Sequence, residues 1–250
     1  MKHIFWIDLK RGLKIRWIFL SVTGLVIAGI YGMRDVYETL VLNDHMGGGM
    51  IFFHFAQTGS SSSAYLYLIP LMAVIPFSSS LRDDIKSGFF TYLIPRCGTN
   101  GYFASKLLIS CMIGGIISLV STLVLYLGCW CVFPPGELEI QDFMMYTTEY
   151  LLIAGRSLSL GMLYAGFWSL AGTVAAVWME DKFVGMGVPF ILSYILVAFQ
   201  ERYYEGFPYL NPHEWASPVM TNGWADFFLL TGLISITGII SFRWLKRRLL

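Results

Sequence analysis

Charged residues are scarce in this sequence. They make up 13% of the 250 residues, whereas soluble domains carry about 25%. Apolar residues reach 56%, and the mean hydropathy is +0.63. This balance argues against a soluble domain and for a membrane protein, whose length is best counted in spans of about 20 residues.

The sequence also lacks the common signatures of catalysis and metal binding. It has no G-x-x-x-x-G-K-[ST] phosphate loop, no H-E-x-x-H motif and no complete G-x-S-x-G turn. The four histidines have no close metal-ligand spacing: His3, His45, His54 and His213. We therefore expect no catalytic residue, no metal site and no cofactor in this chain, and no nucleic-acid partner.

Six apolar runs divide the chain into membrane-sized pieces. They are Ile15–Tyr31, Tyr65–Leu81, Leu107–Phe133, a stretch within Tyr150–Met179, Phe183–Phe199 and Ala225–Phe242. Tryptophan and tyrosine residues lie near their ends, as in an aromatic belt at the membrane surface. The sequence therefore predicts an all-α membrane protein, with one transmembrane domain over 1–250 and six transmembrane helices.

Basic residues are distributed unevenly among the connecting segments. With six spans, 14 of the 17 Lys and Arg residues fall on the side that holds both ends of the chain, and 11 of the 16 acids fall on the other side. Cytoplasmic segments carry the excess of Lys and Arg. Both termini are therefore expected in the cytoplasm, together with the charged segment 82–106.

Segment 1–16 has the pattern of an amphipathic helix. Its apolar positions recur at helical spacing, continuing into the first run: Trp6, Leu9, Leu13 and Trp17. This pattern predicts an interfacial elbow helix that lies on the inner membrane surface before the first span. The alternative is a basic segment that only anchors the topology.

Segment 82–106 is longer and more charged than a connection between spans requires. Its start, SLRDDIKSGFF, can continue as a helix in which Ile85, Phe89 and Tyr92 line up, until IPRCGTNG breaks it. YFASKLL then re-enters the membrane with Lys106 at the interface. A short amphipathic helix at the membrane surface is a docking element for a partner protein. The alternative is a solvated loop whose charges only enforce topology.

Two outer segments are unusual. Gly32–Ala64 contains GGGM and GSSSS, which predict flexible turns on either side of MIFFHFAQ. Segment 200–223 is aromatic and proline-rich, and it predicts either re-entrant helices between spans five and six or a plain surface loop.

The fourth run combines small residues with one charge. Gly and Ala recur at four-residue spacing, which predicts close packing at the centre of the bundle. Arg156 lies within this run, and a charge inside a span marks a candidate functional site. It is close to the outer end, so snorkelling outward or pairing with Glu149 is the alternative.

This arrangement resembles the permease (transmembrane) subunit of a type-2 ABC exporter. In that family a basic amphipathic helix precedes six spans. The loop after the second span carries an acidic-basic helix, a glycine, a leucine-proline-arginine segment and a lysine. The sequence RDDIKSGFFTYLIPR…YFASK holds these in order: Asp83 and Asp84, Gly88, Leu93, Pro95 and Arg96, and Lys106. The sequence departs from the family pattern after the fourth run, where the loop Glu180–Lys182 is very short for a second docking helix.

The resemblance implies that a separate ABC ATPase subunit, which binds ATP and Mg, docks on segment 82–106. The docking residues would be Arg82, Asp83, Asp84, Ile85, Lys86, Gly88 and Phe89. It also implies a second permease copy or a homologous permease, with the exit side of the pathway near Arg156, Trp215 and Tyr209. The expected function is export of a peptide, drug or lipid-like substrate across the cytoplasmic membrane of a bacterium.

The residues leave three other function classes open. A secondary transporter would need acids inside the spans, whereas the acids here lie in loops or at span ends. A membrane enzyme would need a cluster of polar residues at one membrane face, and none is visible. A sensor or immunity protein that binds a peptide at its outer loops is compatible with the same spans.

Overall fold

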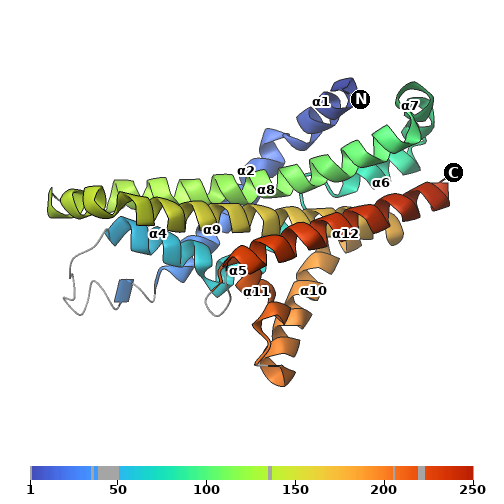
Figure 1. Cartoon of the computed structure of the whole chain (residues 1–250). Coiled ribbons are helices and arrows are strands. Elements are labelled where there is room, and N and C mark those ends of the chain that lie inside the picture. The colour runs from blue at the N-terminus through green and yellow to red at the C-terminus, as the bar shows by residue number, and fades with distance from the viewer. Residues whose placement is uncertain are drawn as a thin grey trace.

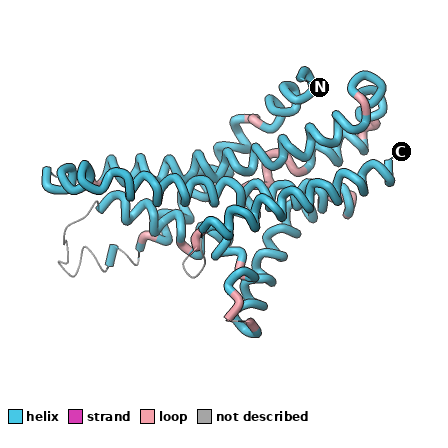
Figure 2. The backbone as a smooth tube through the Cα atoms, viewed as in Figure 1, coloured by secondary structure: helices cyan, strands magenta, loops and turns pink. Residues whose placement is uncertain are grey.

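The structure, a computed structural model, describes residues 2–34, 37–38, 51–134, 137–204, 206–218 and 223–249, without the side chains at 2–4, 96–97, 137–147, 223 and 249. Every element within these ranges is a helix (Figure 1 and Figure 2). In chain order they are α1 (Lys2–Gly12), α2 (Ile15–Gly32), α4 (Ile51–Ser61), α5 (Ser63–Met72), α6 (Ser79–Lys86), α7 (Phe89–Cys97), α8 (Thr99–Val132), α9 (Glu137–Trp178), α10 (Lys182–Tyr203), η1 (Pro208–Leu210), α11 (Pro212–Ala216) and α12 (Gly223–Leu249).

Within the described ranges, five helices are long and apolar enough to cross a membrane. They are α2, α8, α10, residues Thr148–Trp178 of α9 and residues Trp224–Arg248 of α12. Each coincides with one of the predicted apolar runs, so five of the six runs are confirmed as long helices. The chain is accordingly a multi-pass membrane protein.

The second apolar run, Tyr65–Leu81, does not form one helix. α5 ends at Met72, residues 73–78 form turns, and α6 starts at Ser79. Pro76 lies in this break. Proline has no amide hydrogen to donate, and it disfavours helical geometry in the residue before it. The chain therefore bends before it enters the charged segment.

The described part of segment 32–64 is more helical than its sequence predicts. IFFHFAQ and the serines after it form α4 and the start of α5, because Phe52, Phe53 and Phe55 are buried in the core. Ser62 caps α5 by accepting a hydrogen bond from the Tyr65 amide at 3.3 Å. The prediction of a flexible turn at GSSSS was therefore wrong. GGGM and its neighbours lie outside the described residues.

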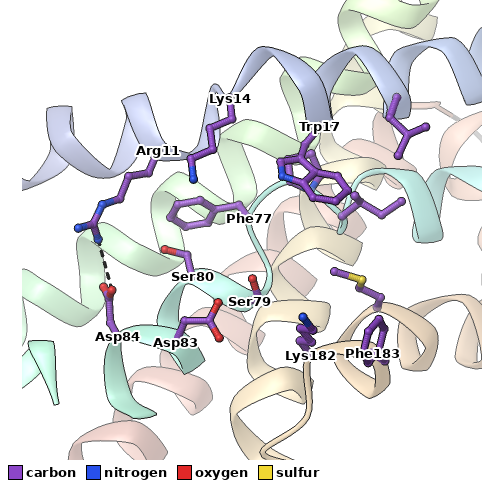
Figure 3. A pocket seen from close by; sticks show the side chains of 14 residues that line it. Arg11, Lys14, Trp17, Phe77, Ser79, Ser80, Asp83, Asp84, Lys182 and Phe183 are labelled. Carbon is purple, nitrogen blue, oxygen red and sulfur yellow. Dashed lines mark hydrogen bonds and ion pairs between the residues drawn. The ribbon is translucent and has the colours of Figure 1, made fainter. Parts of the chain in front are cut away.

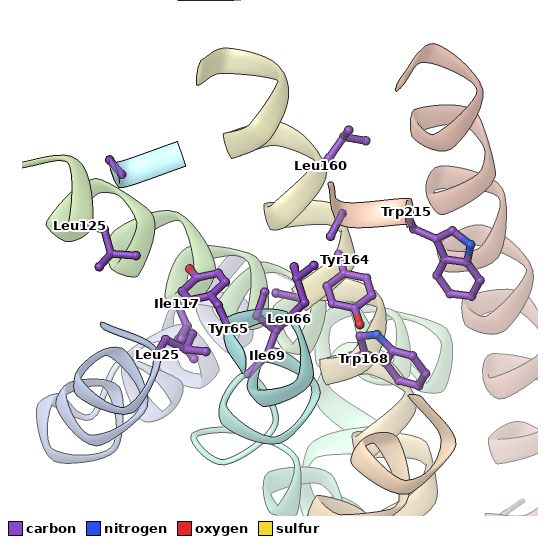
Figure 4. Close-up of a cluster of buried hydrophobic side chains, with 14 of the residues drawn as sticks. Leu25, Tyr65, Leu66, Ile69, Ile117, Leu125, Leu160, Tyr164, Trp168 and Trp215 are labelled. Atoms are coloured by element: carbon purple, nitrogen blue, oxygen red, sulfur yellow. The ribbon is translucent and has the colours of Figure 1, made fainter. Parts of the chain in front are cut away.

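α9 forms the centre of the bundle, as its small residues predict. It packs against α8, α10 and α12, and 67% of its membrane-sized stretch is buried, against 17% for α12. Glycine permits the close approach of α8 to α9, because a Cβ atom at Gly114 of α8 would lie 2.6 Å from the carbonyl oxygen of Ala165 on α9. Leu25, Ile69 and Trp168 belong to the buried cluster that joins α2, α5 and α9 (Figure 4).

Four elements meet at one end of the molecule: α1, α6, α7 and the C-terminal part of α12 (Figure 1). The end of α8 and the start of α9 lie at the opposite end. We call the first the charged end. It brings both terminal helices to the segment for which a docking role is predicted.

Candidate functional site

At the charged end the chain forms a pair of short helices, α6 and α7, instead of one longer helix. Gly88 separates them with a φ of +71°, and Gly98 separates α7 from α8 with a φ of +73°. Both values lie in the left-handed region, which glycine adopts without steric cost. The rest of segment 82–106 is helical as well, since α8 starts at Thr99 and contains Lys106.

Part of the predicted docking set is exposed on this helix pair. Asp83, Lys86 and Phe89 are exposed, and Tyr92 extends the surface with 75% of its area accessible. We call these four residues the α6–α7 surface. The expected line-up with Ile85 does not occur, because the chain bends between the two helices and Ile85 packs against a buried apolar cluster.

Asp84 turns away from the α6–α7 surface, whereas Arg82 pairs with Asp83 at its edge. Asp84 is only 7% exposed. Its Oδ2 lies 2.6 Å from Nζ of Lys106 and accepts a hydrogen bond from the Tyr102 hydroxyl at 3.0 Å. Arg82 is partly buried and donates to the Glu180 carbonyl oxygen at 3.0 Å. These contacts take Asp84 out of the set that could touch a partner and make it a structural residue.

Lys106 is the centre of an ionic cluster that joins three helices. Its side chain is fully buried, and Nζ lies 2.9 Å from Oδ1 of Asp8 on α1 as well as 2.6 Å from Asp84 on α6. It also donates to Oγ of Ser80 at 3.0 Å. Arg11 reaches Oδ1 of Asp84 at 3.3 Å (Figure 3). We call Asp8, Arg11, Asp84 and Lys106 the buried ionic cluster.

The buried ionic cluster is costly to build and costly to break. An ion that leaves water for a protein interior loses several kcal/mol of hydration, which only close pairing and hydrogen bonds offset. Lys106 has two carboxylates and one hydroxyl as acceptors, so its charge is well compensated. Oδ2 of Asp8 has no hydrogen-bond partner among the residues that the structure describes. Displacing α6 would pull these ion pairs apart, so α6 is tied to α1 and α8.

The sequence pattern assigns no role to Asp8 and places Lys106 at the membrane interface. Two signals point to their pairing. Asp8 is the only acid in the basic segment 1–16, and Lys106 adjoins a long apolar run. An acid on the buried face of such a helix needs a cationic partner. Lys106 becomes the partner of Asp8 because α1 crosses α8 at this point. The spacing of residues in the sequence does not predict where two helices cross.

The predicted exit-side residues come from two parts of the fold. Trp215 of α11 is buried, and its indole Nε1 donates to the Tyr209 carbonyl oxygen at 2.7 Å. This bond joins η1 to α11, and α11 packs against α9 and α12. Arg156 is exposed on α9, as a snorkelling side chain would be.

No group of three or more His, Cys, Asp or Glu residues in the described ranges is placed to hold a metal ion. Comparison of the chain with protein-family models, with curated proteins and with solved structures found no match in any of the three. The charged end presents an exposed helix pair, and the buried ionic cluster fixes its first helix, α6, to the membrane bundle.

Proposed function

We propose that this chain is the transmembrane subunit of an ATP-driven exporter of the type-2 ABC permease kind. The observation that carries the proposal is the α6–α7 surface, which stands at the charged end beside both terminal helices (Figure 1). In the proposal this end faces the cytoplasm, where Lys and Arg are enriched. A separate ATPase subunit docks there and supplies the bound ATP and Mg.

The α6–α7 surface has the composition of a protein-binding surface. Phe89 and Tyr92 present exposed aromatic area, and Asp83 and Lys86 present charges of both signs. Aromatic side chains dominate binding energy at interfaces, while charges set specificity and the rate of association. A soluble partner with an apolar groove between charged rims would complement this surface.

The buried ionic cluster supports transmission of motion from this surface into the membrane. α6 is tied through Asp84 to Lys106 of α8, and α8 runs from the charged end to the opposite end (Figure 1). A force on α6 therefore acts on a long span as well as on α1. In the proposed mechanism, closure of two ATPase subunits on ATP moves the spans through this connection.

The family resemblance supplies the remaining parts of the proposal. A second copy of this chain or a homologous permease completes the pathway through the bilayer, with its exit side near Arg156, Trp215 and Tyr209. The substrate is a peptide, a drug or a lipid-like molecule, and the complex works in the cytoplasmic membrane of a bacterium.

Purification from native membranes tests the proposal. The tagged protein, extracted in mild detergent, is expected to bring ATPase activity with it. Lys86→Glu combined with Tyr92→Ala should lower that activity by about tenfold or more, because both side chains lie on the α6–α7 surface. Arg247→Glu, which reverses an exposed charge on α12 at the same end, is the control and should retain the ATPase. A wild-type chain that purifies without an ATPase, or a surface variant that keeps it, contradicts the proposal.

A further inference from the structure

The charged end also contains a cavity of about 500 Å³ next to the buried ionic cluster. Its walls come from the junction of α1 and α2, from the bend before α6 together with α6 itself, and from the start of α10 (Figure 3). These segments are far apart in the sequence, so no local pattern predicts the cavity.

Two lysines in this cavity are free to bind an anion. Lys14 lines it from the α1–α2 junction and Lys182 from the start of α10 (Figure 3), and neither forms a salt bridge with a residue in the described ranges. The acids of the wall are already paired. Asp83 lies 3.1 Å from Arg82, and Asp84 belongs to the buried ionic cluster. An anion entering the cavity would therefore meet two lysines that form no salt bridge within the described ranges, although Lys182 lies over the Phe183 ring and next to Asp181.

Exposed apolar side chains also line the cavity. Trp17 and Leu20 of α2 and Phe183 of α10 line it, and all three are exposed. Tryptophan close to lysine is typical of the depth at which lipid headgroups lie. Asp181, the acid that precedes α10, uses its carboxylate to cap that helix. The cavity thus combines two lysines with apolar side chains of membrane-spanning helices.

We propose that this cavity binds the headgroup of an anionic phospholipid. The phosphate lies between Lys14 and Lys182, and the acyl chains follow the exposed apolar faces of α2 and α10. Basic pockets between membrane helices recognise anionic headgroups in this way. A soluble anion would use the lysines but would gain nothing from the wall of Trp17, Leu20 and Phe183. The proposal needs no partner protein and is independent of the ATPase.

Lipid titration followed by native mass spectrometry tests the site. The purified protein is titrated with phosphatidylglycerol or with phosphatidylcholine of the same chain length. Wild type should retain one phosphatidylglycerol more tightly than phosphatidylcholine. The double variant Lys14→Gln/Lys182→Gln should bind phosphatidylglycerol about tenfold more weakly or worse, with phosphatidylcholine unchanged.

The control variant is Lys10→Gln/Lys246→Gln, which removes two exposed lysines outside the cavity and should keep the preference. Both cavity lysines are exposed, so their replacement should leave the unfolding temperature unchanged. Equal affinity of wild type for the two lipids overturns the proposal. So does a loss of phosphatidylglycerol affinity in the control variant as large as the loss in Lys14→Gln/Lys182→Gln. Displacement of the bound lipid by inorganic phosphate alone would assign the cavity to a soluble anion, and it would overturn the lipid assignment.

Discussion

Lys106 is the residue on which the charged end depends most. Lysine is almost never fully buried unless it is paired, and here Asp8 and Asp84 share it. Removing one member of a buried ion pair leaves the other charged in a medium that solvates it poorly. The cost of breaking the cluster is therefore larger than the net stability that the cluster contributes.

Lys106→Met should lower the free energy of unfolding by about 3–5 kcal/mol, because two carboxylates lose their shared cation. Unfolding of the purified protein in SDS measures this change. Asp8→Asn/Lys106→Met should be more stable than Lys106→Met alone. In the single variant Arg11, 3.8 Å from Asp8 and 3.3 Å from Asp84, is the one cation left to two carboxylates, and the double variant leaves it one. A Lys106→Met variant as stable as wild type would show that the cluster does not hold α1 and α6 on α8.

His213 gives the region of α11 a pH dependence. Burial lowers the pKa of His213 from 6.5 to about 4, and its ring packs edge-on against Tyr67 with 4.3 Å between centroids. Between these pH values the unfolded chain binds a proton that the folded chain does not. The contribution of neutral His213 to the free energy of unfolding is therefore complete above pH 6.5 and is lost as the pH drops toward 4. The loss is on the order of 1 kcal/mol or more.

His213→Gln should remove this part of the pH dependence, because the amide does not titrate. Unfolding temperatures of the two proteins at pH 7 and pH 4.5 measure the difference. The difference in unfolding temperature between pH 7 and pH 4.5 should be smaller for His213→Gln than for wild type. An equal gap in both proteins would mean that His213 is accessible to protons in the folded state.

At the scale of helices, the contact between α9 and α10 depends on a glycine. A Cβ atom at Gly185 would overlap the Cβ of Ala176 and lie 2.7 Å from its Cα. At Gly187, two residues further along α10, a Cβ atom would meet nothing within 4 Å. The two positions form a matched pair on one helix.

Gly185→Ala should lower the free energy of unfolding by about 1–3 kcal/mol, because the added methyl group forces the helices apart. Gly187→Ala should be neutral or slightly stabilising, because alanine favours the helix. Melting of the two purified variants in the same detergent provides the comparison. Similar effects at both positions would rule out the close approach of α10 to Ala176.

The long helices could be predicted from the sequence, and their junctions could not. Apolar composition along a run decides whether it can span a membrane, so five runs were recognisable. The break after Met72 is caused by a proline inside an apolar run. α4 depends on the burial of its phenylalanines by helices distant in sequence. Asp84 was assigned to the surface because side-chain direction beyond that break does not follow from spacing.

At the scale of the whole molecule, the proposed topology puts the two ends of the bundle on opposite sides of a membrane. Cys131 is an exposed free cysteine at the end of α8 that lies away from the charged end. Thr91 is exposed on α7 at the charged end. Chemical labelling at these positions reports the orientation.

A membrane-impermeant maleimide should label Cys131 in intact cells when the other three cysteines are replaced by serine. Thr91→Cys in a background without other cysteines should be labelled only after the cells are permeabilised. This difference is expected because positively charged segments stay in the cytoplasm. The reverse pattern would invert the topology and place the α6–α7 surface outside the cell.

The proposed contact between the α6–α7 surface and an ATPase can be tested directly by photo-crosslinking. A photoreactive amino acid replaces Tyr92, or replaces Trp130 as the control, an aromatic residue 54% exposed near the other end of α8. Native membranes are irradiated, and adducts are probed for binding of labelled ATP. We predict an ATP-binding adduct from position 92 and none from position 130. Membranes in which position 92 captures no ATP-binding protein would contradict the proposed function.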